Sequence, residues 1–110
     1  MAGQNAKVSI YLIGEGFLGP QQSITWWWKM NRYNSEVRTF YAIPKPLQKP
    51  YPRQIQIDRV RIKNVTTGDE LKYKAYITIT NPDPPLQIQE GWPDGCYYEL
   101  FMAVAFPDYA

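Results

Sequence analysis

Apolar and polar residues alternate over much of this chain, with the period of two that is typical of β-strands. The clearest run extends from Leu71 to Thr80. Because successive side chains of a strand point to opposite faces, one set is predicted to face the interior and the other to face outward. The predicted interior set is Leu71, Tyr73, Ala75, Ile77 and Ile79, and the outward set is Lys72, Lys74, Tyr76, Thr78 and Thr80.

Five further runs are predicted to be strands. The run 54–65 changes parity between Ile57 and Val60, which predicts a β-bulge near Asp58 and Arg59. The run 96–106 is apolar on both faces, so it is predicted either to be covered on both sides or to contact a partner. The other three runs are marked by Val8, Ile10 and Leu12; by Ile24, Trp26, Trp28 and Met30; and by Val37, Thr39, Tyr41 and Ile43, with Phe40 and Ala42 on the more polar face.

Turn signals separate these runs. Four prolines between 44 and 52 predict an extended crossover between sheets. Residues 66–69, Thr-Thr-Gly-Asp, predict a tight hairpin turn, and the proline-rich segment 81–85 ends the preceding strand. A chain of 110 residues suits one domain. The sequence therefore predicts an all-β fold, a two-sheet antiparallel sandwich of six to eight short strands in a single domain over residues 1–110.

The segment from Gln54 through Ile-Thr-Ile-Thr-Asn-Pro at 77–82 resembles the paired strands of immunoglobulin-like and fibronectin-III-like domains, where an alternating strand often closes on an Asn-led turn. The resemblance implies an immunoglobulin-like sandwich. It implies no particular function, because such sandwiches carry many unrelated ones. The cysteine pair and the Cys-Trp-Cys spacing of immunoglobulin domains are missing.

Few residues offer catalytic or metal-binding chemistry. The chain has no histidine and a single cysteine, Cys96, which excludes nucleophile–His–acid triads and zinc sites with several Cys or His ligands. Glu90 and Asp94 form a formal carboxylate pair, and Asp83 would add an oxygen ligand for calcium, but the spacing matches no EF-hand loop. We therefore predict that the protein is not an enzyme and has no metal site and no cofactor.

Two tryptophans are the candidates for ligand recognition. Trp27 lies between Thr25 and Lys29 on the outward side of its run, where an indole can stack on a sugar ring or anchor a protein partner. The alternative is that Trp27 covers the outer face of its sheet beneath a loop. Trp92 lies in the loop 87–95, where together with Glu90 and Asp94 it would form the aromatic platform and polar edges of a carbohydrate site. The alternative is that Trp92 closes the end of the core.

Basic residues gather on two neighbouring runs. A turn centred on Thr67-Gly68 would place Lys63 opposite Lys72, and a register shifted by two would place Lys63 opposite Glu70. The face is either an anion-binding patch or an ordinary solvated surface that discourages aggregation. The predicted members of the patch are Arg59, Arg61, Lys63, Lys72 and Lys74.

Charge and cysteine content limit the choice of partner and compartment. A net charge of +2 does not favour nucleic acid, and no apolar stretch is long enough to span a membrane. The single cysteine and the lack of a visible signal peptide favour the cytoplasm without fixing the localisation. We expect a non-catalytic module that binds carbohydrate or a protein surface through exposed aromatic side chains. The alternative is a structural subunit that forms a homo-oligomer through the strand 96–106.

Overall fold

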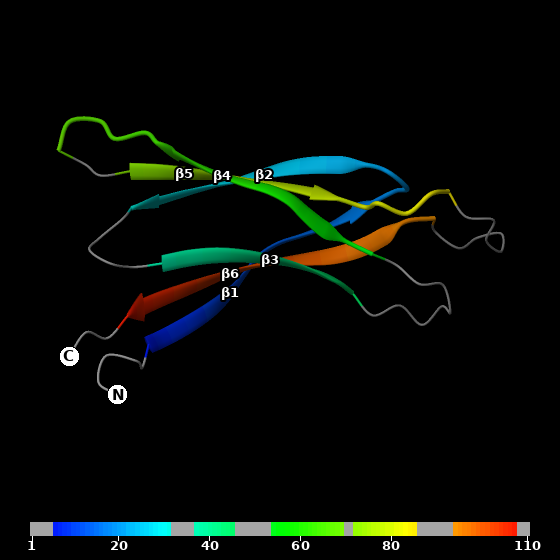
Figure 1. The fold of residues 1–110 in the computed structure, drawn as a ribbon, viewed down its shortest axis with the longest axis horizontal. Coiled ribbons are helices and arrows are strands. Elements are labelled where there is room, and N and C mark those ends of the chain that lie inside the picture. The colour runs from blue at the N-terminus through cyan, green and yellow to red at the C-terminus, as the bar shows by residue number, and fades with distance from the viewer. Residues whose placement is uncertain (1–5, 32–36, 46–53, 70–71, 86–93, 108–110) are drawn as a thin grey trace.

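Six antiparallel strands form two sheets that pack face to face (Figure 1). The computed structural model describes residues 6–31, 37–45, 54–69, 72–85 and 94–107, and these residues contain no helix. One sheet has the strand order β1-β6-β3, and the other has the order β2-β5-β4. This arrangement confirms the predicted two-sheet antiparallel sandwich. The strands are β1 (Ala6–Leu18), β2 (Ser23–Asn31), β3 (Val37–Pro44), β4 (Gln56–Asn64), β5 (Lys72–Thr80) and β6 (Cys96–Pro107).

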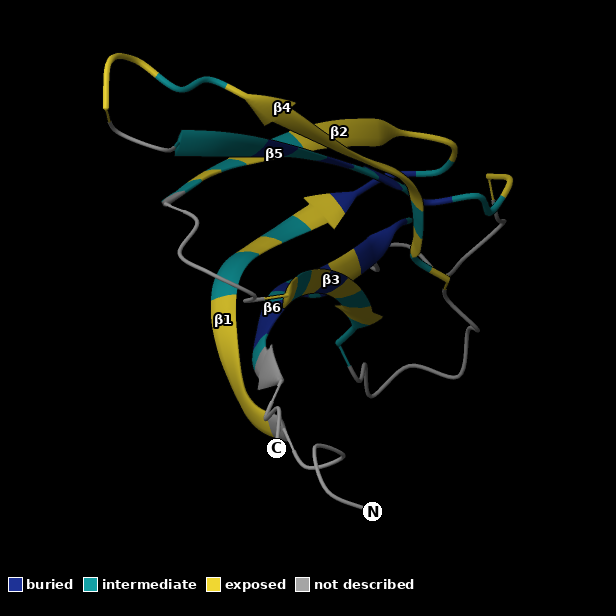
Figure 2. Cartoon of the chain, turned by 60° about the vertical axis from the view of Figure 1, so that its left-hand side comes forward, coloured by how far each residue is buried: buried dark blue, intermediate teal, exposed yellow. Residues whose placement is uncertain are grey.

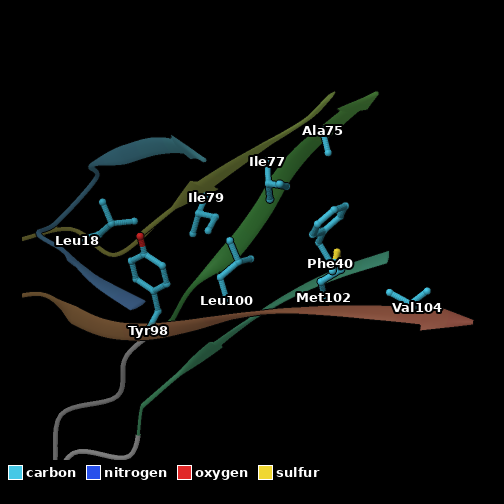
Figure 3. Close-up of a cluster of buried hydrophobic side chains, with 9 residues drawn as sticks. All are labelled: Leu18, Phe40, Ala75, Ile77, Ile79, Tyr98, Leu100, Met102 and Val104. Atoms are coloured by element: carbon cyan, nitrogen blue, oxygen red, sulfur yellow. The ribbon is translucent and has the colours of Figure 1, made fainter. Parts of the chain in front are cut away.

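The two central strands, β5 and β6, supply most of the core (Figure 3). Alternate residues of β5 point toward alternate residues of β6, as the period of two requires. This confirms the predicted inward face of β5 for the described residues, and it makes β6 a central strand that is buried on its inner side. The buried residues of the two strands are Ala75, Ile77 and Ile79 on β5 and Cys96, Tyr98, Leu100, Met102 and Val104 on β6.

The predicted bulge on β4 is confirmed. The register with β5 shifts between Ile57 and Arg59, so Asp58 is the extra residue. Ile57 lies opposite Ile79 and Val60 lies opposite Ile77, which puts both apolar side chains on the inner side of the sheet. Because β4 is an edge strand, Val60 is nevertheless 44% exposed.

The apolar residues that mark β1 lie outside the core. Val8, Ile10 and Leu12 share the outer face of their sheet with the odd-numbered residues of β6, and Ile10 is 66% exposed. Figure 2 shows the first part of β1 coloured as exposed. The register with β6 shifts between Leu12 and Gly14, and beyond this bulge the strand turns Gly14 and Leu18 inward. An alternating pattern shows which residues share a face, but pairing with β6 decides which face is buried.

The predicted orientation of β3 is wrong for the same reason. Phe40 is buried beside its cross-strand partner Met102, and it belongs to the core. Tyr41 and Ile43, which mark the predicted inward face, are about half exposed on the outer face. Both faces of this strand are apolar, so the sequence pattern could not distinguish them.

Two glycines of β1 leave room for two large rings. A Cβ atom on Gly14 would lie 2.7 Å from the Trp26 ring, and a Cβ atom on Gly16 would lie 2.5 Å from the Tyr98 hydroxyl. The two rings meet edge to face, and the Trp26 indole nitrogen donates a hydrogen bond of 2.7 Å to the Tyr98 hydroxyl. The Gly14-Glu15-Gly16 sequence therefore serves core packing.

Cys96, the single cysteine of the sequence, is buried at the start of β6, so the chain cannot form an internal disulfide. Within the described residues there is also no helix long and apolar enough to cross a membrane.

Candidate binding surface on the outer face of β2-β5-β4

The outer face of the β2-β5-β4 sheet carries aromatic, basic and hydroxyl side chains in cross-strand rows. Directly paired residues of antiparallel strands lie on the same face of the sheet, so the register assigns each row. Because Ala75, Ile77 and Ile79 are buried, the even-numbered residues of β5 define the outer face. Taken from β2 through β5 to β4, the rows are Lys29, Lys74 and Lys63; Trp27, Tyr76 and Arg61; and Thr25, Thr78 and Arg59.

Trp27 lies in the middle row and is 58% exposed, so its indole reaches solvent as the alternation predicts. The ammonium group of Lys74 lies over the indole, 4.3 Å from the ring centroid. A cation at this distance is attracted by the negative face of the ring. The contact therefore links Trp27 on the edge strand β2 to Lys74 on the central strand β5.

Tyr76 continues this stacking toward β4. The guanidinium carbon of Arg61 lies 4.7 Å from the Tyr76 ring centroid, and the Lys74 ammonium lies 5.4 Å from it. Aromatic and cationic groups thus alternate from Trp27 to Arg61 across three strands. Each cation keeps hydrogen-bond donors that do not face a ring, because an ammonium has three donors and a guanidinium has five.

Six described cations, Lys72 among them, give this face an excess of positive charge. Within the described part of the chain, no ion pair with a carboxylate is formed by Lys29, Arg59, Arg61, Lys63 or Lys74. Lys74 lies directly between Lys29 and Lys63, and each such like-charge pair destabilises a sheet by a few tenths of a kcal/mol. Lys72 lies on the same face at the start of β5. We name the basic face as the set Lys29, Arg59, Arg61, Lys63 and Lys74.

The register corrects both pairings that the sequence allowed. Lys63 lies opposite Lys74, not Lys72 or Glu70, and Arg61 lies opposite Tyr76. The predicted segment 66–69 contains a turn at Gly68 and Asp69, where Gly68 has a φ of 61°. The connection is longer than a tight hairpin, because β4 ends at Asn64 and β5 begins at Lys72, and the Val65 amide donates a hydrogen bond of 2.9 Å to the carbonyl of Lys72. The longer connection moves each β4 residue two positions along β5.

Hydroxyl groups lie beside the Trp27 row. Thr25 and Thr78 are joined by a hydrogen bond of 3.0 Å, and Ser23 and Thr80 by one of 2.6 Å. The carboxylate of Asp58, next to this row, accepts hydrogen bonds from Gln56 and Thr80 and is therefore already engaged. These hydroxyls retain further donor or acceptor capacity toward a polar ligand.

The second predicted site falls mostly outside the described residues, which include neither Glu90 nor Trp92. Asp94 is described and lies just before β6, where its backbone carbonyl is close to Gly19 in the β1–β2 connection. Asp94 thus leads into the other sheet and is not one of the residues that pair across β2, β5 and β4 around Trp27.

The proposed oxygen ligands for calcium do not form a group in the described part. Asp83 accepts hydrogen bonds from the Gln54 backbone amide at 3.1 Å and from its side chain at 2.9 Å. The described residues contain no cluster of three His, Cys, Asp or Glu side chains that could hold a metal ion.

Sequence reasoning did not include Lys29 or Tyr76 in either predicted site, although both lie on this face. The signal was present in the spacing, because Lys29 lies two positions after Trp27 and Tyr76 lies two positions after Lys74. Residues two apart on a strand share a face. What the spacing could not give was the register that joins the three strands into one surface.

The opposite outer face, on β1-β6-β3, has a different character. It is apolar over most of its length and lacks a cluster of like charges in the described residues. Glu15 and Glu99 lie across from each other toward one end, where Lys45 forms an ion pair with Glu15 at 3.0 Å. The apolar rows contain Val8, Ala105 and Val37; Ile10 and Ala103; and Leu12, Phe101 and Tyr41.

The sequence matches no known protein-family model, and no curated protein or solved structure shows significant similarity to it.

Proposed function

We propose that this protein is a non-catalytic binding module that holds a carbohydrate chain against the outer face of β2-β5-β4. The observation that carries the proposal is the exposed Trp27, on the edge strand β2 in the middle row of a face with polar and charged neighbours. A sugar presents apolar C–H groups, which favour an indole, together with hydroxyls, which need hydrogen-bond partners such as Thr25 and Thr78.

The surroundings of Trp27 favour carbohydrate over a protein partner. The centres of protein interfaces are depleted of charged residues, and lysine is among the most depleted. Here, Lys74 lies over the indole and Lys29 is two residues away on the same strand. Burying these lysines under an apolar protein surface would cost their hydration without replacing it.

Substitution of Trp27 by alanine, assayed on a glycan array and by titration with each glycan that binds, tests the proposal. We expect affinity to fall by about tenfold or more, or about 1.4 kcal/mol, while the thermal midpoint changes little because the side chain is exposed. The matched control is Tyr41→Ala, which removes an aromatic ring of similar exposure from the opposite outer face. A wild-type protein that binds no glycan, or equal losses in both variants, would contradict the proposal.

We further infer that the sandwich is immunoglobulin-like in its connectivity. Immunoglobulin constant domains have strands A, B, E and D in one sheet and C, F and G in the other. If β2 to β6 correspond to strands B to F, then β2-β5-β4 matches B-E-D and β3-β6 matches C-F. In this correspondence β1 lies beside β6, in the place of strand G.

A second candidate function, self-association, is supported by the apolar outer face of β1-β6-β3. Three strands about 4.8 Å apart, over about ten residues, span roughly 500 Å². Two copies packed face to face would bury about 1,000 Å² in total, which is near the lower limit for a specific interface. The expected product is therefore a weak homodimer whose population depends on concentration.

Sedimentation velocity over a concentration series tests this second function. Ile10→Lys should shift the protein toward monomer, because Ile10 lies within the apolar rows. Thr25→Lys, a substitution on the other outer face, should leave the distribution unchanged. A wild-type protein that remains monomeric at the highest concentration would exclude the homodimer.

A further inference from the structure

We infer that the ligand of the β2-β5-β4 outer face is an acidic polysaccharide, whose sugars carry carboxylate or sulfate groups at regular intervals. This inference rests on the proposed function, because it names the class of carbohydrate that the same surface binds. Four observations carry it: the concentration of positive charge on this face, the regular spacing of the cations, the cations that lie over the Trp27 and Tyr76 rings, and the like-charge pairs across the strands.

The positive charge is concentrated although the net charge of the chain is only +2. Five of the twelve basic residues lie on the basic face. The one described acidic side chain beside them, Asp58, accepts hydrogen bonds from Gln56 and Thr80. A surface with one sign of charge raises the local concentration of ligands of the opposite sign.

The cations form a grid that suits a repeating polymer. Neighbouring strands are about 4.8 Å apart, and successive outward residues of one strand are about 7 Å apart. Arg59, Arg61 and Lys63 follow one another along β4 at the spacing of about 7 Å. Lys63, Lys74 and Lys29 follow one another across the sheet at the strand spacing of about 4.8 Å. A chain with a charge on each repeat can meet several cations at once. Arginine adds paired donors that fit the two oxygens of a carboxylate or sulfate.

The stacked cations distinguish this surface from a single-stranded nucleic acid site. Such sites use open aromatic faces on which successive bases stack. Here Lys74 lies over Trp27, and Arg61 lies over Tyr76. A base that stacks on either of these ring faces would have to displace the cation, whereas an anionic sugar can bind the cation where it is and contact the exposed part of the indole.

The row of three lysines gives a reason why binding would stabilise the fold. Lys74 repels both Lys29 and Lys63 across the strands, and no described carboxylate compensates them. An anion placed over this row removes the repulsion. Binding should therefore raise the thermal midpoint of the protein, in addition to producing a measurable affinity.

Titration of the full chain with matched polymers tests the inference. The probes are polygalacturonate, for carboxylates; heparin, for sulfates; fully methyl-esterified polygalacturonate, as the uncharged match; and oligo-deoxythymidine, for nucleic acid. We expect polygalacturonate or heparin to bind and the esterified polymer not to bind. Affinity should fall steeply as the screening length decreases from about 30 Å at 0.01 M salt to about 3 Å at 1 M salt.

Charge-removing variants locate the binding. Arg61→Gln and Lys63→Gln should each weaken acidic-polymer binding by about threefold to tenfold. Lys7→Gln, which removes an exposed lysine from β1 on the other sheet, should have no effect. Equal losses in all three variants would overturn the assignment to this face.

The outcomes separate this inference from the function on which it rests. If the esterified polymer binds as tightly as polygalacturonate, the acidic ligand is wrong and the carbohydrate-binding function stands. If oligo-deoxythymidine binds more tightly than both acidic polymers, the inference is overturned in favour of nucleic acid. If no polymer binds and the glycan array is also empty, both the inference and the proposed function fail.

Discussion

Gly16→Ala tests the close packing of β1 against the core. The added Cβ atom would lie 2.5 Å from the Tyr98 hydroxyl and 2.8 Å from the ring carbon that bears it, whereas carbon atoms in contact are about 3.5 to 4.0 Å apart. Tyr98 is 1% exposed, so its ring cannot relieve the overlap without disturbing the core around it. Overpacking of this kind costs about 1 to 3 kcal/mol.

Two further contributions adjust this cost. Displacing the Tyr98 ring also strains the hydrogen bond from the Trp26 indole nitrogen, which contributes about 1 kcal/mol. Replacing glycine by alanine reduces the entropy of the unfolded chain, which stabilises the folded state by about 0.4 to 1 kcal/mol. The net destabilisation should be about 2 kcal/mol, which corresponds to a decrease of about 8 °C in the thermal midpoint.

Urea unfolding followed by tryptophan fluorescence measures the change; Trp26, one of the four tryptophans, lies at the displaced contact. The control is Glu15→Ala, whose side chain forms an exposed ion pair with Lys45 and whose loss should cost at most about 0.5 kcal/mol. If Gly16→Ala were as stable as the wild type, the packing of Tyr98 on β1 would be refuted.

Two other substitutions and one deletion test separate parts of the fold. Tyr98→Phe should cost about 1 kcal/mol at neutral pH by leaving the Trp26 donor without its partner. Burial raises the pKa of the Tyr98 phenol above 10.0, and the hydrogen bond from Trp26 lowers this pKa by a smaller amount. The unfolded chain therefore loses this proton first, and the wild type should lose stability relative to Tyr98→Phe as alkaline denaturation proceeds above pH 10.0. Deleting Asp58 should turn Ile57 outward and cost about 2 kcal/mol in urea unfolding, unless the bulge re-forms elsewhere. Asn81→Ala should cost about 1 to 3 kcal/mol in the same assay, because this buried amide loses hydrogen bonds of 3.0 Å and 2.9 Å.

The sequence predicted the features that depend on local alternation. The inward face of β5 and the bulge on β4 follow from parity alone, since inner and outer residues there differ clearly in polarity. The outward direction of Trp27 follows in the same way from its neighbours Thr25 and Lys29. These elements belong to a sheet whose outer face is polar, which is the condition under which a period of two identifies the core.

The same reasoning fails in the β1-β6-β3 sheet, where both faces are apolar. Ile10 and Tyr41 satisfy the pattern of an inner face, yet they lie outside, and Phe40 lies inside. On β3 the two sides are similarly apolar, so alternation cannot identify the buried side. On β1 the alternation is clear, but pairing with β6 places the apolar set outside and Lys7 and Ser9 on the inner side. Register is also non-local, so the sequence could not place Lys63 opposite Lys74.

Folding alone requires neither outer face to have its observed composition. A sandwich is stable when its inner faces are apolar and its outer faces are mixed and polar, so a row of three lysines and an apolar sheet face each need a separate reason. The core formed by β5 and β6 lies between them.

Substitutions at exposed positions of one face should therefore leave the core and the other face unchanged, since distant sites contribute independently. Arg61→Gln and Ile10→Lys combined in one chain should weaken polyanion binding and self-association by the amounts that each causes alone. Coupling between the two effects would mean that the faces act together, for example if the dimer rather than the monomer binds the polymer.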